Sequence, residues 1–155
     1  MHRLRMILIA LALPAGLTAQ SGDTPLSYAD YAAIAAQIDP AKHVVDIETF
    51  LRRREDGAVV IDLRNPDKYA AGHLPGALHL DSTNITANAL AALIVDPAQL
   101  VLIYCDNSLM PTRMISLTDI ALPQFIAHGY EAVFMTGFMG LSPALADGRL
   151  DMVQD

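Results

Sequence analysis

The residue best equipped for covalent chemistry is Cys105, the only cysteine in the 155-residue chain. It follows an apolar run, residues 100–104, and precedes Asp106, Asn107 and Ser108. Such a run is typical of a strand buried on both faces of a parallel sheet. Ligands of open α/β sheets bind beyond the carboxyl ends of the strands. We therefore predict a nucleophilic thiol at a binding edge, with Asp106, Asn107 and Ser108 in a substrate-binding loop.

Two charged residues bear on whether this thiol ionises. Backbone N–H groups turned toward the sulfur, or the N-terminus of a following helix, would favour the thiolate. Asp106 opposes ionisation unless its side chain turns away, because one negative charge disfavours a second nearby. Arg113 is the only basic residue shortly after Cys105. We expect it to steady the thiolate or an anionic sulfur donor, with a surface ion pair as the alternative.

The apolar patterns around Cys105 alternate between strand and helix periods. Extended segments are predicted at residues 43–46, 58–63, 78–80, 100–104 and 132–135, and helices at 28–38, 47–57, 66–71 and 86–94. This order predicts an α/β, three-layer fold with a mostly parallel central sheet flanked by helices. A loop over about 106–115 follows the cysteine. Ser116 and Asp119 then predict a capping box for the next helix, in which Pro123 causes a kink or marks the first turn.

Several motifs together resemble the rhodanese superfamily. They are Asp-Leu-Arg at 62–64, Gly-His-Leu-Pro-Gly-Ala at 72–77, a strand ending in Tyr-Cys at 104–105, and Gly-Tyr at 129–130. Their order and spacing match over roughly residues 43–140. Lys-Tyr at 68–69 replaces the acidic-aromatic pair of the family pattern. The cysteine loop also departs from that pattern, because it is longer and contains no glycine.

The resemblance implies a sulfurtransferase or sulfur carrier in which Cys105 takes up a sulfane sulfur as a persulfide and passes it on. It implies no cofactor, and its partners would be a small sulfane-sulfur donor or a protein thiol acceptor. The alternative is a non-catalytic binding or redox-sensing module of the same fold, because fold alone does not determine activity. Phosphatase chemistry is disfavoured because Pro111 stands where a Cys-x5-Arg motif requires arginine.

Three further residues are expected to support the site. Asp62 and Arg64, at a strand end, are interpreted as a buried ion pair that braces the loops. His73 is interpreted as a hydrogen-bonded fastener of its turn, in which Gly72 ends a helix and Pro75-Gly76 form a tight turn. No metal site is expected, because the histidines and Cys105 lack any locally spaced ligand pair.

The N-terminal segment predicts export. Arg3 and Arg5 precede an apolar run of about a dozen residues that ends near Ala19, the layout of a signal peptide. The run is short for a membrane span, so we expect no stable anchor after cleavage and a periplasmic or secreted protein. The predicted organisation is a signal peptide at 1–19, a helical extension at 20–42 and one domain at 43–155. The net charge of −7 disfavours nucleic-acid binding, and the oligomeric state stays open.

Overall fold

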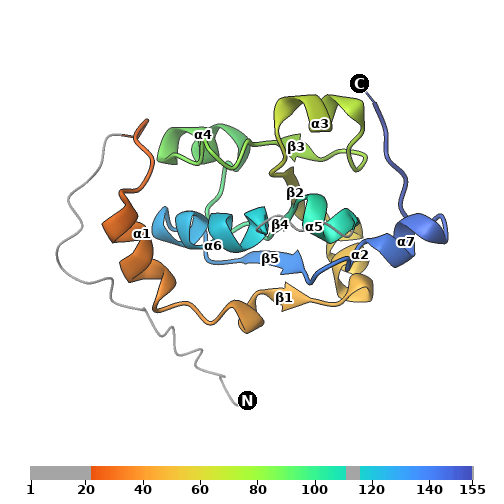
Figure 1. Ribbon diagram of the computed structural model, residues 1–155, viewed down its shortest axis with the longest axis horizontal. Coiled ribbons are helices and arrows are strands. Elements are labelled where there is room, and N and C mark those ends of the chain that lie inside the picture. The colour runs from red at the N-terminus through yellow and green to blue at the C-terminus, as the bar shows by residue number, and fades with distance from the viewer. Residues whose placement is uncertain (1–21, 111–115, 155) are drawn as a thin grey trace, which may run out of the picture.

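The computed structural model describes residues 22–110 and 116–154. Its centre is a sheet of strand order β1-β5-β4-β2-β3 in which every neighbouring pair is parallel (Figure 1). The strands are β1 Val44–Val45, β2 Val59–Asp62, β3 Leu78–His79, β4 Val101–Tyr104 and β5 Val133–Thr136. The predicted α/β fold with a parallel sheet is confirmed.

Helices cover both faces of this sheet (Figure 1). They are α1 Tyr28–Ala35, α2 Ile47–Glu55, α3 Pro66–Ala71, α4 Ala87–Leu93, α5 Asp106–Leu109, α6 Leu117–Ala127 and α7 Ser142–Ala146, with a short 3-10 helix, η1, at Pro40–Lys42. One hydrophobic cluster lies between the sheet and helices α4 and α6. The other lies between the opposite face and helices α2 and α7. Helix α1, in the predicted N-terminal extension, packs against α6.

Strand β4 is buried along its whole length because it lies at the centre of the sheet. Alternate side chains of a strand point to opposite faces. Val101, Ile103 and Cys105 accordingly join the cluster under α4 and α6, whereas Leu102 and Tyr104 join the cluster under α2 and α7. This alternation fixes the face toward which the cysteine points.

Local sequence signals explain several of the element ends. Asp46 caps α2 by accepting a hydrogen bond from the Thr49 N–H at 2.7 Å. Helix α3 spans the predicted residues and ends at Gly72. In the next turn, Ala77 N–H donates to the Leu74 carbonyl oxygen at 2.9 Å, and Gly76 has a φ of 77°. Glycine is favoured there because it adopts positive φ without a steric penalty.

Two helix predictions need correction. Helix α1 ends at Ala35 rather than Ile38. The predicted capping box of α6 is wrong, because the Ser116 hydroxyl is hydrogen-bonded to the Thr118 hydroxyl at 2.7 Å instead of to the helix backbone. Pro123 lies inside α6, so it does not mark the first turn.

The predicted signal segment, residues 1–19, lies outside the described residues. Within the part of the chain that the structure covers, no helix combines the length and apolar character needed to span a membrane.

Candidate active site

Cys105 lies directly after β4, at the carboxyl edge of the sheet, as its position in the sequence predicts. Cys105 is nevertheless buried there, because only 1% of it is solvent-exposed. Its side chain belongs to the hydrophobic cluster under α4 and α6, together with Ile103 and Met135. Strand alternation turns the sulfur toward this face, and helix α6 covers the face.

Cys105 is also the N-cap residue of α5. As in a capping box, its side chain faces the Ser108 N–H, although no hydrogen bond to the sulfur forms, and the Ser108 hydroxyl accepts from the Cys105 N–H at 3.4 Å. The Ser108 N–H itself donates to the Cys105 carbonyl oxygen at 3.0 Å. The prediction of a single loop over 106–115 is therefore wrong at its start, because residues 106–109 form a helical turn.

Helix α5 is fastened to the segment that follows β5. Met139 N–H donates to the Asn107 carbonyl oxygen at 2.7 Å, and Leu141 N–H donates to the Ser108 carbonyl oxygen at 2.9 Å. The Ser142 hydroxyl donates to the Leu109 carbonyl oxygen at 2.6 Å. These bonds satisfy carbonyl groups that a short helix leaves without intrahelical partners. The backbone beside the sulfur is therefore anchored at three successive carbonyls.

The carboxylate of Asp106 forms an ion pair with Lys68 of α3. The Asp106 side chain is only 11% exposed, whereas that of Lys68 is 44% exposed. The negative charge that the sequence places beside Cys105 thus has a cationic partner. Lys68 was not among the site residues predicted from the sequence. The available signal was its position in the motif, where the family pattern has an acidic residue.

Asp62 and Arg64 form the predicted buried ion pair at the end of β2, at 2.6 Å. Arg64 also donates to the Gly72 carbonyl oxygen at 2.6 Å, which ties the strand to the Gly-His-Leu-Pro-Gly-Ala turn. Burial alone would lower the pKa of Arg64, but the hydrogen bond to Asp62 and the negative charge of Asp62 together outweigh burial, and the pKa is raised. The buried ion pair is present where the sequence predicts it, and its role as a brace of the loops stays a prediction.

Tyr104, the residue before the cysteine, completes this network. Its hydroxyl donates to Asp62 at 2.7 Å and accepts from the Leu74 N–H at 3.0 Å. Burial, followed by the negative charge of Asp62, raises the pKa of Tyr104 far above its ordinary value. The phenol therefore stays protonated and serves as a fixed donor beneath the turn.

The side chain of His73 packs and hydrogen-bonds within its own turn, as the sequence predicts. The ring is stacked on Tyr69 with centroids 3.9 Å apart, and Nδ1 lies 3.1 Å from the Tyr69 carbonyl oxygen. The backbone of His73 pairs with Val153 in both directions. His73 is buried. Arg113 lies outside the described residues.

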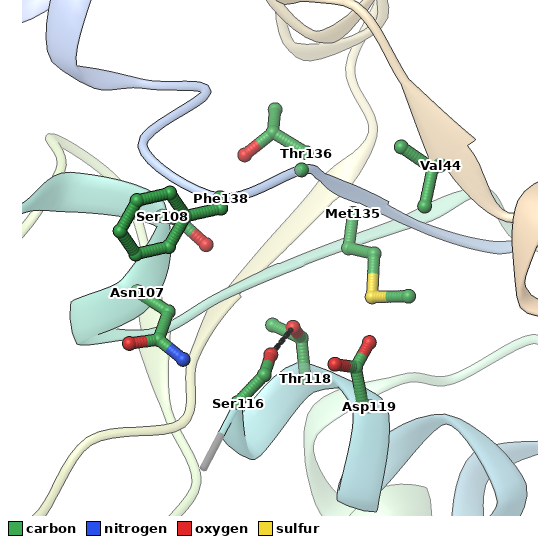
Figure 2. Close-up of a pocket in the computed structure, with 10 residues that line it drawn as sticks. Val44, Asn107, Ser108, Ser116, Thr118, Asp119, Met135, Thr136 and Phe138 are labelled. Carbon is green, nitrogen blue, oxygen red and sulfur yellow. Dashed lines mark hydrogen bonds between the residues drawn. The ribbon is translucent and has the colours of Figure 1, made fainter. Parts of the chain in front are cut away.

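A pocket of about 270 Å³ opens between the start of β1, the end of β5 and helices α5 and α6 (Figure 2). Ser108, which hydrogen-bonds the Cys105 backbone, contributes to its wall, as does Met135, which packs in the same cluster as the sulfur. Polar side chains come from α5, from the start of α6 and from the end of β5, and apolar ones from β1, from β5 and from the segment after β5. The lining residues are Val44, Asn107, Ser108, Ser116, Thr118, Asp119, Met135, Thr136, Gly137 and Phe138.

A second pocket, of about 310 Å³, lies on the other side of α5. It has two cationic side chains, Arg64 and Lys68, and one carboxylate, Asp106. Helix α5 therefore separates a pocket with cationic groups from one whose only charged group among the described residues is Asp119. Across the described ranges, no three His, Cys, Asp or Glu side chains converge as metal ligands would.

The fold and site define an α/β domain with a buried thiol at the carboxyl edge of a parallel sheet. The family model of the Rhodanese-like domain matches residues 46–137. The chain belongs to this family.

Curated relatives share part of their length with this chain. The thiosulfate sulfurtransferase GlpE of Pseudomonas entomophila is 44% identical over 61 residues, which cover 39% of this chain and 55% of that protein. The protein of the same name from Pseudomonas aeruginosa is 33% identical over 81 residues, covering 52% of this chain and 64% of the relative. The chain thus spans between about half and two thirds of the length of these relatives.

Solved structures support the fold. The Alr3790 protein from Anabaena has a TM-score of 0.56 at 18% identity, covering 71% of this chain and 91% of that one. The 30 kDa polysulfide-sulfur transferase homodimer from Wolinella succinogenes has a TM-score of 0.53 at 17% identity, covering 82% of this chain and 86% of that one. At these identities the similarity is one of fold.

Proposed function

We propose that this protein is a sulfurtransferase or sulfur carrier that uses Cys105 as its nucleophile. The observation that carries the proposal is the position of Cys105, at the end of the central strand, capping α5 between two pockets. Relatives named thiosulfate sulfurtransferase add support for sulfur transfer as the reaction class.

The proposed cycle has two nucleophilic substitutions. Cys105 loses its proton to solvent, and its thiolate attacks the sulfane sulfur of a donor such as thiosulfate. The sulfur–sulfur bond of the donor breaks, sulfite leaves with the electron pair, and Cys105 carries a persulfide. An acceptor thiolate then attacks the outer sulfur, and Cys105 leaves as the thiolate.

The charges around α5 suit the two half-reactions. Lys68 neutralises Asp106, so the carboxylate does not oppose the Cys105 thiolate as an unpaired charge. Arg64 and Lys68 in the pocket on the β2 side can donate hydrogen bonds to an anionic donor, and each of them is also paired with a carboxylate. Burial of the sulfur among apolar side chains restricts water, which protects a bound persulfide from hydrolysis.

Mass spectrometry of the intact protein after incubation with thiosulfate tests the proposal. We expect one added sulfur atom, removed by a thiol acceptor, and no addition to Cys105→Ser. A protein that stays unmodified by thiosulfate and by inorganic polysulfide, while iodoacetamide alkylates Cys105, would contradict it.

A second candidate is the non-catalytic redox-sensing or binding module. The near-complete burial of Cys105 favours it, because a slow-reacting thiol beneath a short helix suits a sensor whose oxidation displaces that helix. Oxidation of Cys105 by peroxide without any sulfur uptake from the donors above would support this candidate.

A further inference from the structure

The pocket lined by the start of β1 and the end of β5 does not suit the anionic sulfur donor of the proposed cycle. Its charged lining among the described residues consists of Asp119, which has no ion-pair partner there. Figure 2 shows the Asp119 carboxylate directed from α6 toward Met135, across the open space of the pocket. A dianion such as thiosulfate would face a negative charge with no compensating cation from the described wall.

A second observation points to a ligand at the same place. Thr136 lines the pocket and is 4% exposed, yet its hydroxyl oxygen has no hydrogen-bond partner. A buried hydroxyl without a partner is costly, and a ligand in the pocket would supply that partner. Hydroxyls of Ser108, Ser116 and Thr118 lie in the same wall. The pocket thus offers neutral hydrogen-bonding groups, one carboxylate and an apolar wall that includes Met135.

We infer that this pocket receives the sulfur acceptor and that the acceptor is a small thiol bearing an amine. The inference rests on the proposed function of Cys105. The ammonium group lies near Asp119, the short carbon chain packs on Met135 and Val44, and the thiol points toward Cys105. A volume of about 270 Å³ is below the usual size of drug-sized ligand pockets, so it suits a small molecule rather than a protein segment.

Sulfur transfer in this arrangement requires a short reach. A persulfide extends the reactive atom about 2 Å beyond the Cys105 sulfur, and the pocket wall includes Ser108, the capping partner of Cys105. The amine-bearing thiol loses its proton to solvent, and its thiolate attacks the outer sulfur. The bond to Cys105 breaks, Cys105 leaves as the thiolate, and the acceptor departs as a persulfide. Asp119 acts as a specificity determinant and takes no part in bond making.

The test measures charge preference at the sulfur without requiring a persulfide. Cys105 of the full chain is reacted with cystamine, which is cationic, and with bis(2-hydroxyethyl) disulfide, which is neutral. The thiolate attacks one disulfide sulfur, the other leaves as a thiolate, and mass spectrometry measures the rate of mixed-disulfide formation. We expect cystamine to react faster, with the rate ratio falling two- to fivefold in Asp119→Asn, as expected for an exposed ion pair.

Asp151→Asn is the matched control, because Asp151 is exposed and does not line the pocket. It removes the same net charge and should leave the ratio unchanged. An equal fall in both variants, an unchanged ratio in Asp119→Asn, or failure of both reagents to reach Cys105 overturns the inference.

The same measurement separates the inference from the proposed function. If thiosulfate loads no sulfur but the Asp119-dependent ratio persists, the proposed function fails and the pocket retains its preference for amines. If sulfur loads normally and the ratio does not depend on Asp119, the function stands and the assignment of the acceptor is wrong.

Discussion

At the scale of single residues, the ion pair between Lys68 and Asp106 decides how the charge beside the sulfur is balanced. Asp106 is mostly buried next to Cys105, so its carboxylate cannot rely on solvent for compensation. Lys68 reaches it from α3, across the gap between two elements distant in sequence. Removing the lysine leaves a buried charge, whereas removing both partners restores neutrality.

Lys68→Gln should slow alkylation of Cys105 by neutral iodoacetamide at pH 7.5 by up to about tenfold, because the unpaired carboxylate disfavours the thiolate. A neutral reagent excludes direct effects on an anionic donor. The double variant Lys68→Gln/Asp106→Asn should regain most of the rate. Equal alkylation rates in Lys68→Gln and the wild-type protein would show that the pair has no influence on the thiol.

Tyr104→Phe should lower the free energy of unfolding by about 1–3 kcal/mol, because it removes a donor to Asp62 and leaves the Leu74 N–H buried without a partner. Urea denaturation measures the change. Tyr130→Phe is the control, since the Tyr130 hydroxyl makes no hydrogen bond to a described residue, and a change below about 0.5 kcal/mol is expected. Equal losses in the two variants would mean that the network contributes nothing specific.

At the scale of elements, the Gly-His-Leu-Pro-Gly-Ala turn connects α3 to β3 and sets the position of α3, which carries Lys68. Gly76 provides the positive φ that the turn requires, and no atom crowds the place of a Cβ there. The cost of a substitution is therefore one of backbone conformation alone.

Gly76→Ala should destabilise the protein by about 1–2 kcal/mol, the cost of a left-handed conformation for an L-residue. Gly76→Asn should cost less, because asparagine tolerates this conformation. Thermal unfolding followed by circular dichroism compares the two. If alanine and asparagine cost the same, the penalty does not arise from φ.

At the scale of the whole molecule, the parallel sheet brings the ends of β5, β4 and β2 together, so that α5 lies between the two pockets. His128, at the end of α6, makes the free energy of unfolding of the domain depend on pH. Its pKa is lowered by burial. The folded protein therefore binds a proton at this residue less readily than the unfolded chain does.

The stabilisation that neutral His128 contributes is fully present above the pKa of this residue in the unfolded chain, which is near 6.5. It is lost as the pH falls through the lower pKa that His128 has in the folded protein. The free energy of unfolding should decrease between pH 7.5 and 5.5. His128→Gln should show a smaller decrease, measured by urea denaturation at both pH values. The same decrease in this variant would assign the pH dependence to other groups.

Export of the protein stays a prediction from the first 19 residues. Expression of the full chain in a Gram-negative host, followed by fractionation and N-terminal sequencing, should yield a periplasmic or secreted product that begins after Ala19. A cytoplasmic product that retains Met1 would contradict the prediction.

Much of the fold followed from sequence alone because its signals are local. Buried apolar runs predicted β2 and β4, proline and glycine marked the ends of α3 and the following turn, and the motif order indicated the rhodanese superfamily. The position of Cys105 at the end of β4 was predictable for the same reason. Local signals failed at the capping box of Ser116, because a nearby hydroxyl competes for the same hydrogen bond.

Tertiary structure alone decided the surroundings of the sulfur. Packing of α6 over one face of β4 buries Cys105, and the approach of α3 to α5 pairs Lys68 with Asp106, 38 positions apart. The pocket that contains Asp119 and Thr136 is built from four elements, β1, β5, α5 and α6, and their adjoining turns. Composition and periodicity specify elements and turns, whereas contacts between distant residues depend on how those elements pack, which no local pattern encodes.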